Sequence, residues 1–297
     1  MQRIITAGVD GSVESLDAAD WAAREALRRG LALCLLHAGD EPEARTGLPE
    51  LDAPADRVAR AVNRAARVLA FAHPTLEIVR RQVPGPPVEA LLAAAESSET
   101  LALGSRGFTG FAGFLVGSVA LAVTARATRP VVLVRAGERP EDEHWDSEAG
   151  PYRPVVLGID LDHPCDELIE YAFYAAATRR APLHALHTWT VPLAPSGSAV
   201  DPEEEKTHAL AAALTPWRNK FPDTDVTERT FHGRAAHHLL MASTKASLLI
   251  IGRRIPSGVH LGPVAHSVIH HSLCPVAVVP HESSRLTSTT GPGSRTD

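Results

Sequence analysis

The chain has 297 residues, of which 44% are hydrophobic, and this length suits two domains of about 150 residues each. The formal net charge is -6, and neither half has a block of lysine or arginine residues. These features argue against a broad basic surface that would bind nucleic acid. No apolar run approaches the roughly 18 to 20 residues of a membrane span, and the N-terminus lacks a signal-peptide pattern. We therefore expect a soluble, cytoplasmic protein that binds neither nucleic acid nor membranes.

In the first half, short β-branched or leucine-rich runs alternate with longer helical patterns. Strands are predicted near residues 3–9, 31–37, 76–83, 100–104 and 130–135. Helices are predicted near residues 13–29, 53–71, 86–97 and 116–127. Such alternation predicts right-handed β-α-β crossovers and a parallel sheet with helices on both faces.

The stretch GSRGFTGFAGFLVGSV, residues 104–119, places five glycines between a predicted strand and a predicted helix. Ligands of open parallel sheets bind at the carboxyl ends of the strands. Glycine lets the backbone approach a ligand, and a helix that begins at Gly117 and Ser118 offers unpaired N–H groups to an anion. The spacing favours a phosphate site, and the alternative is a flexible surface loop before an ordinary helix. It is neither a Walker loop nor a dinucleotide fingerprint.

The chain contains a tandem duplication. Gly8 and Asp10 recur 150 residues later as Gly158 and Asp160, and the run PVVLVR recurs as PVAVVP. The repeated units are of domain size. The predicted organisation is a first domain at 1–137, a linker at 138–152, a second domain at 153–281 and a disordered tail at 282–297.

The spacing Gly104-x2-Gly107-x9-Gly117-Ser118 resembles the signature of ATP-binding universal stress proteins, Gly-x2-Gly-x9-Gly-Ser/Thr. The resemblance covers both halves, so the chain is similar to a tandem universal stress protein of the actinobacterial kind. It implies two doubly wound α/β domains, each with a five-stranded parallel sheet of order 3-2-1-4-5 flanked by helices. It also implies a nucleotide-dependent stress-response or regulatory protein that binds ATP, with the presence of Mg left open.

The same resemblance implies an adenine-nucleotide site in the first half. Its residues would be Val9 and Asp10 at the adenosine, Ala38 in the adenine slot, Leu103, Gly104, Arg106 and Gly107 along the ribose and phosphates, and Gly117, Ser118 and Val119 at the phosphates. Two of them have structural alternatives. Asp10 also suits the turn that caps the next helix, and Arg106 also suits a solvent-exposed loop.

The second half departs from this pattern. Gly252 and Gly262 align with Gly104 and Gly117, but they are separated by 10 positions instead of 13. Pro263 stands where the first half has serine, which removes a hydroxyl and a backbone N–H, although proline is also a good first residue of a helix. We therefore predict a degenerate second domain and one nucleotide per chain.

No metal ligand or disulfide is predicted. His266 and His270 are one helical turn apart, but no acidic or cysteine residue accompanies them, so solvated or interface histidines are favoured over a metal site. The three cysteines lie unclustered in apolar runs and are predicted to be buried thiols: Cys34, Cys165 and Cys274.

Two alternatives to a regulatory function stay open. A slow ATPase or phosphoryl-transfer enzyme would need groups that position a metal and a nucleophile, and the first loop offers hydroxyls and Arg106 but no carboxylate pair or lysine. We therefore expect at most weak ATP hydrolysis. The other alternative is a structural interaction module without a ligand.

The apolar runs RPVVLVR and CPVAVVP are predicted to pair and to join the two halves within the chain. An unknown protein partner and a homodimer are left open.

Overall fold

The structure is a computed structural model that describes residues 3–39, 49–105, 116–147, 150–163, 165–190, 202–255 and 260–282. The first half contains β1 (Ile4–Gly8), α1 (Val13–Arg29), β2 (Ala32–Ala38), α2 (Pro49–Ala72), β3 (Ile78–Val83), α3 (Pro87–Glu96), β4 (Thr100–Ser105), α4 (Ser118–Arg126) and β5 (Val131–Arg135). A short 3-10 helix, η1 (Pro140–Glu143), follows. The second half contains β6 (Val155–Ile159), α5 (Asp166–Arg179), β7 (Leu183–Trp189), α6 (Pro202–Lys220), β8 (Val226–His232), α7 (Ala235–Ser243), β9 (Leu248–Arg254), α8 (Pro263–His271) and β10 (Val276–His281).

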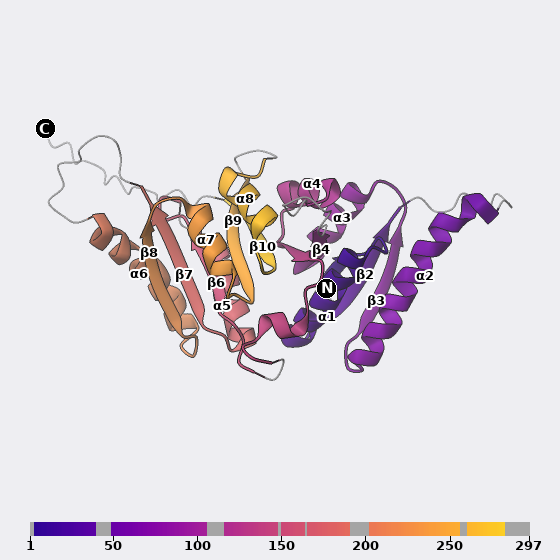
Figure 1. The fold of residues 1–297 in the computed structure, drawn as a ribbon, viewed down its shortest axis with the longest axis horizontal. Coiled ribbons are helices and arrows are strands. Elements are labelled where there is room, and N and C mark those ends of the chain that lie inside the picture. The colour runs from indigo at the N-terminus through magenta and orange to yellow at the C-terminus, as the bar shows by residue number, and fades with distance from the viewer. Residues whose placement is uncertain are drawn as a thin grey trace, which may run out of the picture.

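The ten strands form one sheet that runs through both halves (Figure 1). Their order is β3-β2-β1-β4-β5-β10-β9-β6-β7-β8. Neighbouring strands are parallel within each half, and β5 and β10 are antiparallel. Each half therefore has the order 3-2-1-4-5, and the predicted α/β fold is confirmed.

Helix α1 shows why these segments adopt their predicted structure. Ser12 is its N-cap, with a side chain that accepts a hydrogen bond from the Ser15 amide, and Gly30 ends it in a left-handed conformation at φ 63°. One face carries small, fully buried side chains, which include Ala18 and Ala22. Because these side chains are small, α1 packs closely on the sheet.

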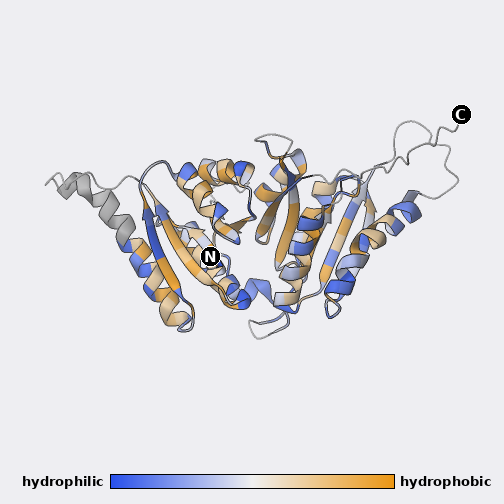
Figure 2. Ribbon diagram, turned by 180° about the vertical axis from the view of Figure 1, so that it is seen from behind, coloured by the Kyte–Doolittle hydropathy of each residue, from blue (hydrophilic) through white to orange (hydrophobic). Residues whose placement is uncertain are grey.

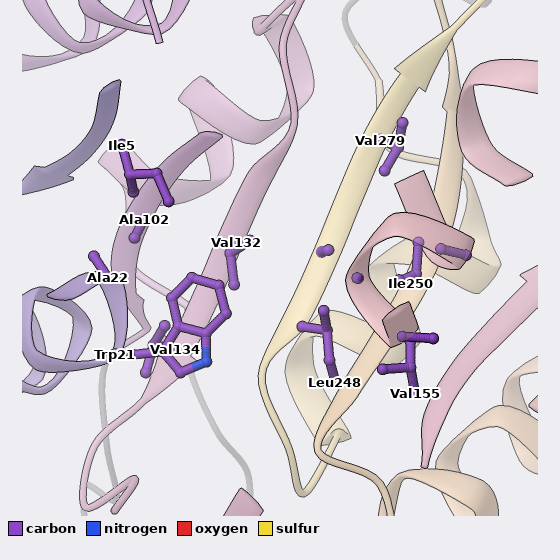
Figure 3. Close-up of a cluster of buried hydrophobic side chains, with 14 of the residues drawn as sticks. Ile5, Trp21, Ala22, Ala102, Val132, Val134, Val155, Leu248, Ile250 and Val279 are labelled. Atoms are coloured by element: carbon purple, nitrogen blue, oxygen red, sulfur yellow. The ribbon is translucent and has the colours of Figure 1, made fainter. Parts of the chain in front are cut away.

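Apolar side chains fill both faces of the sheet. One cluster combines residues of α1, α2, α5 and α6, and the other combines residues of α3, α4, α7 and α8. In Figure 2 the strands are predominantly hydrophobic, while hydrophilic residues are frequent on the helices. Figure 3 shows that Trp21 and Val132 of the first half belong to the same cluster as Leu248 and Ile250 of the second. The two halves therefore share a continuous core.

The halves are joined through their last strands. Val276, Ala277 and Val278 of β10 pair with Leu133, Val132 and Val131 of β5. Arg135 adds a hydrogen bond from Nη1 to the carbonyl of Leu273 at 2.6 Å. The predicted pairing of the two apolar edges is thus confirmed.

A buried cluster of charged side chains also connects the halves. Glu25 of α1 is 0% exposed, and its carboxylate lies 2.6 Å from Arg179 of α5 and 2.5 Å from Arg29. Arg28 contacts Glu25 at 3.0 Å and Glu143 of η1 at 2.8 Å. The segment predicted as a linker is therefore packed into the protein at Glu143.

The charges in this cluster depend on one another. Burial alone would raise the pKa of Glu25, but the guanidinium groups around it, that of Arg179 foremost, outweigh burial and hold the pKa well below its usual range. The pKa of Glu143 is lowered in the same way by Arg28 and Arg24, against the effect of burial. Removing one member would leave a buried charge uncompensated.

The pKa of Glu138, which follows β5, shifts in the opposite direction. Burial, together with the nearby carboxylates of Asp142 and Glu143, raises the pKa of Glu138 to about 8. Between about pH 4.5 and pH 8 the folded protein keeps a proton here that the unfolded chain releases, so stability falls as pH rises through this window.

We expect Glu138→Gln to flatten that part of the pH profile. As pH rises from about 4.5 to about 8, the free energy of unfolding of the unmodified protein is expected to fall by about 2 to 5 kcal/mol because Glu138 loses its proton. Urea unfolding at pH 5 and pH 8 measures the loss in both proteins, with Glu141→Gln, an exposed neighbour on η1, as control. If the unmodified protein and Glu138→Gln lose the same stability between pH 5 and pH 8, the raised pKa of Glu138 is contradicted.

Three further expectations from the sequence concern the cysteines, membrane spans and the C-terminal tail. The three cysteines are free and buried, as predicted. Within the described part of the chain, no helix is both long and apolar enough to cross a membrane. Residues 283–297, nearly all of the predicted tail, lie outside the described residues.

Candidate functional site

The predicted first-half residues gather at one edge of the sheet. Val9 and Asp10 follow β1, Ala38 ends β2, and Gly104 lies next to the last residue of β4. Because β1 pairs with both β2 and β4 in parallel, these carboxyl ends adjoin. The sheet therefore brings the predicted strand-end residues together.

Two of these residues already have roles in the fold. The Val9 amide donates to the Leu36 carbonyl at 2.8 Å, and His37 Nδ1 lies 2.9 Å from the Val9 carbonyl. The Leu103 side chain is 4% exposed and belongs to the core. Any contact of Leu103 with a ligand would have to come from its backbone.

Asp10 is exposed and organises the turn before α1. Its Oδ1 accepts from the Ser12 amide at 2.9 Å and from the Ser12 hydroxyl at 2.6 Å. Burial would raise the pKa of Asp10, but these hydrogen bonds outweigh it and lower the pKa. The turn alternative is thus confirmed, with Ser12 as the N-cap and Asp10 bonded to Ser12, and a ligand contact by the Asp10 carboxylate stays a prediction.

Gly104 is required by packing. A Cβ on Gly104 would lie 2.5 Å from the carbonyl of Glu14 and 2.8 Å from the amide of Ser15, both in the backbone of α1. The glycine spacing predicted ligand approach here. The close approach of α1 to β4 is a sufficient reason for the glycine, and a ligand contact stays a prediction. A glycine pattern cannot distinguish these two causes.

We therefore expect Gly104→Ala to destabilise the protein by about 1 to 3 kcal/mol, because the clash is with backbone atoms that cannot rotate away. Gly262→Ala is a matched control. There a Cβ meets nothing within 4 Å, and we expect a change within about 0.5 kcal/mol. Chemical denaturation measures both, and equal stabilities would contradict the packing role.

The N-terminus of α4 is exposed. Gly117 is the N-cap at φ -62° and ψ 150°, a conformation available to any residue, and as a glycine it has no side chain to form a cap hydrogen bond. Ser118 and Val119, the first residues of α4, are exposed. The first amides of a helix have no partner within the helix, so they are suited to an anion. Arg106 and Gly107 lie outside the described residues.

The second half contains a cavity of ≈ 490 Å³ at the corresponding place, which we call the second-half pocket. Its volume is within the range of small-molecule sites. Its lining comes from the ends of β6, β7 and β9, from α5, α7 and the start of α8, and from His281. Asp160, Gly252 and Gly262, the counterparts of first-half site residues, are among the lining residues. The described residues of the second half therefore enclose a cavity at this position.

Several histidines of the second half lie close to one another. The rings of His266 and His270 lie 4.4 Å apart. In the described ranges, no group of three histidine, cysteine or acidic residues is placed to hold a metal ion. His281 lines the pocket, and burial lowers its pKa.

The chain matches the family model of the universal stress protein family over residues 1–135 and 151–280. It belongs to the universal stress protein family. A universal stress protein of Mycobacterium tuberculosis is 30% identical over 294 residues, which cover 93% of this chain and 97% of that protein.

A solved structure shows the same architecture. A universal stress protein from Archaeoglobus fulgidus superimposes with a TM-score of 0.68 at 18% identity, covering 93% of this chain and 98% of that one. A universal stress protein solved in complex with cAMP matches 46% of this chain and 99% of its own, at 28% identity and a TM-score of 0.37.

Within this universal stress protein, the sequence does not reveal the second-half pocket. Arg253 and Arg254 immediately follow Gly252 and could reach a phosphate by side chain, whereas the shortened loop suggests an eroded site. A cavity depends on how neighbouring elements are spaced, and loop length alone does not reveal it. The degeneracy of the second half stays a prediction.

Proposed function

We propose that the chain binds one ATP molecule in its first half, at the carboxyl ends of β1 and β4. The observation that carries this proposal is the start of α4, where Gly117 leaves the first amides of the helix without a side-chain cap. Such amides, together with the positive end of the helix dipole, favour phosphate. The pair Gly117 and Ser118, which matches the end of the family signature, supports the same ligand.

In this proposal, different groups of the protein contact the nucleoside and the phosphates of ATP. The Asp10 carboxylate accepts a hydrogen bond from a ribose hydroxyl or the adenine amine, and it repels phosphate. The start of α4 holds the phosphates. A magnesium ion would enter bound to the phosphates of ATP, because the described residues include no three-ligand cluster of their own.

The proposed role is that of a nucleotide-dependent stress-response or regulatory protein in the cytoplasm, with hydrolysis weak at most. Membership of the universal stress protein family supports this role. A fast phosphoryl-transfer enzyme would need groups that position a nucleophile and a metal.

Titration calorimetry of the full chain with ATP tests the proposal. We expect a stoichiometry near one, weaker binding in Asp10→Ala, and unchanged binding in Asp160→Ala. Because Asp10 also caps a turn, the stability of Asp10→Ala is measured alongside. A stoichiometry near two, with the second site lost in Asp160→Ala, would contradict it.

A further inference from the structure

The outward face of α2 carries two exposed apolar side chains next to arginines. Phe71 is 90% exposed and Val68 is 59% exposed. Arg64 and Arg67 are also exposed, and they lie on the same face because residues three, four or seven positions apart in a helix share one side. We call Arg64, Arg67, Val68 and Phe71 the α2 stripe.

The stripe has a positive charge that the rest of the described chain does not neutralise. Arg64 and Arg67 form no ion pair with another described residue, and the positions one turn away on α2 include no acidic residue. Arg60 and Arg80 flank the stripe, and Arg80 donates a hydrogen bond to Asn63 of the same helix at 2.5 Å. A partner that matches this surface is therefore negatively charged.

The second half shows that the fold does not require this stripe. Helices α2 and α6 are equivalent in the duplication, and they end at Ala72 and Lys220, equally far in sequence from β3 and β8. The positions of α6 that correspond to the stripe hold exposed, uncharged residues: Ala212, Thr215, Pro216 and Asn219. Packing of an outer helix on the sheet therefore does not account for the arginines and the exposed apolar side chains of α2.

The position and shape of the stripe favour an extended partner. Helix α2 lies at one end of the elongated molecule, next to the edge strand β3 (Figure 1). A stable protein interface uses about 20 to 30 residues on each side, whereas the stripe is one narrow, convex helix surface. An anionic bilayer requires no matching groove. Arginines contact its headgroups, and apolar side chains such as Phe71 enter the boundary between headgroups and acyl chains.

We propose that the α2 stripe binds reversibly to the surface of membranes that contain anionic lipids. The composition of the whole chain predicted no membrane contact, because net charge and hydropathy are averages that do not show a local stripe. At physiological ionic strength, charges separated by more than about 8 Å are largely screened, so acidic residues elsewhere do not prevent this contact. The contact requires no bound nucleotide, so it is independent of the proposed ATP site.

Co-sedimentation of the full chain with lipid vesicles tests the proposal. We expect binding to vesicles of equal parts phosphatidylglycerol and phosphatidylcholine, and little binding to phosphatidylcholine alone. Raising the salt concentration to about 0.5 M should weaken binding at least about fivefold. Arg64→Gln combined with Arg67→Gln should weaken binding about tenfold or more, and Phe71→Ser should weaken it at least about fivefold.

Each variant has a matched control in the second half. Arg229→Gln combined with Lys245→Gln removes the same charge from exposed positions. Met241→Ser removes an apolar side chain of α7 that is 61% exposed. Both controls should bind the vesicles as the unmodified protein does. Thermal unfolding checks that all variants fold, and we expect small changes in stability because every substituted side chain is exposed.

Three outcomes of the vesicle experiment would overturn the proposal. These are equal binding to both kinds of vesicle, no binding to either, and equal weakening by the stripe variants and their controls. Soluble poly-glutamate is the probe for an acidic protein partner. If the unmodified chain binds poly-glutamate through the stripe but does not bind the anionic vesicles, the stripe is a protein-binding surface and the membrane assignment is wrong.

Discussion

Replacing Glu25 with alanine is expected to lower the free energy of unfolding by about 3 to 5 kcal/mol at pH 7. The change leaves Arg179, which is 2% exposed, without its carboxylate partner. Arg28 and Arg29 lose the same partner. Chemical denaturation measures the loss, and Glu99→Ala, which breaks an exposed pair with Arg3, should cost under about 1 kcal/mol.

The sign of the pH dependence adds a second test. The folded-state pKa of Glu25 is depressed, so its stabilising contribution is complete above its ordinary pKa of 4.5 and is lost as pH falls below that value. The difference between Glu25→Ala and the unmodified protein should therefore shrink in acid. Glu25→Leu combined with Arg179→Met should recover much of the stability, because it removes both buried charges. A loss under about 1 kcal/mol in Glu25→Ala would contradict the role of the cluster.

Gly117→Val is expected to weaken ATP binding by at least 100-fold, or about 2.7 kcal/mol, while changing stability little. The φ of -62° at Gly117 is ordinary for valine, so the substitution does not strain the backbone. The substitution therefore acts on the ligand, because a branched side chain would stand where phosphate approaches the α4 amides. Calorimetry gives the affinity, and thermal unfolding gives the stability.

Gly262→Val is the matched control for this prediction. Gly262 is the N-cap of α8 at φ -63° and ψ 161°, nearly the same conformation as Gly117. With ATP bound only in the first half, Gly262→Val should leave the ATP affinity unchanged. Normal ATP affinity in a folded Gly117→Val protein would refute the proposed phosphate site.

Features set by local pattern could be predicted from the sequence. Alternating strand and helix patterns predicted the α/β fold, and the repetition of Gly8 and Asp10 revealed the duplication. The apolar last strands predicted the pairing of β5 with β10 because an unpaired apolar edge is unfavourable.

Features that depend on distant neighbours could not be predicted. Glu25 and Arg179 are 154 positions apart, so nothing near either residue reveals the buried pair, although a glutamate on the alanine face of α1 was a signal. Gly104 looked like a ligand glycine because sequence spacing does not show that α1 approaches it. In the candidate site, the strand-end residues were placed correctly at one edge, but their contacts with a ligand depend on groups that spacing does not reveal.

The antiparallel join of β5 and β10 also limits how copies of this protein can assemble. Among the described strands, it leaves only β3 and β8 as outer edges of the sheet. Both carry charged residues, with exposed Arg80 and Arg81 on β3 and exposed Arg229 on β8, and charged edge strands resist the addition of another strand. Both outer edges of the sheet are thus poorly suited to pairing with a strand of a second copy.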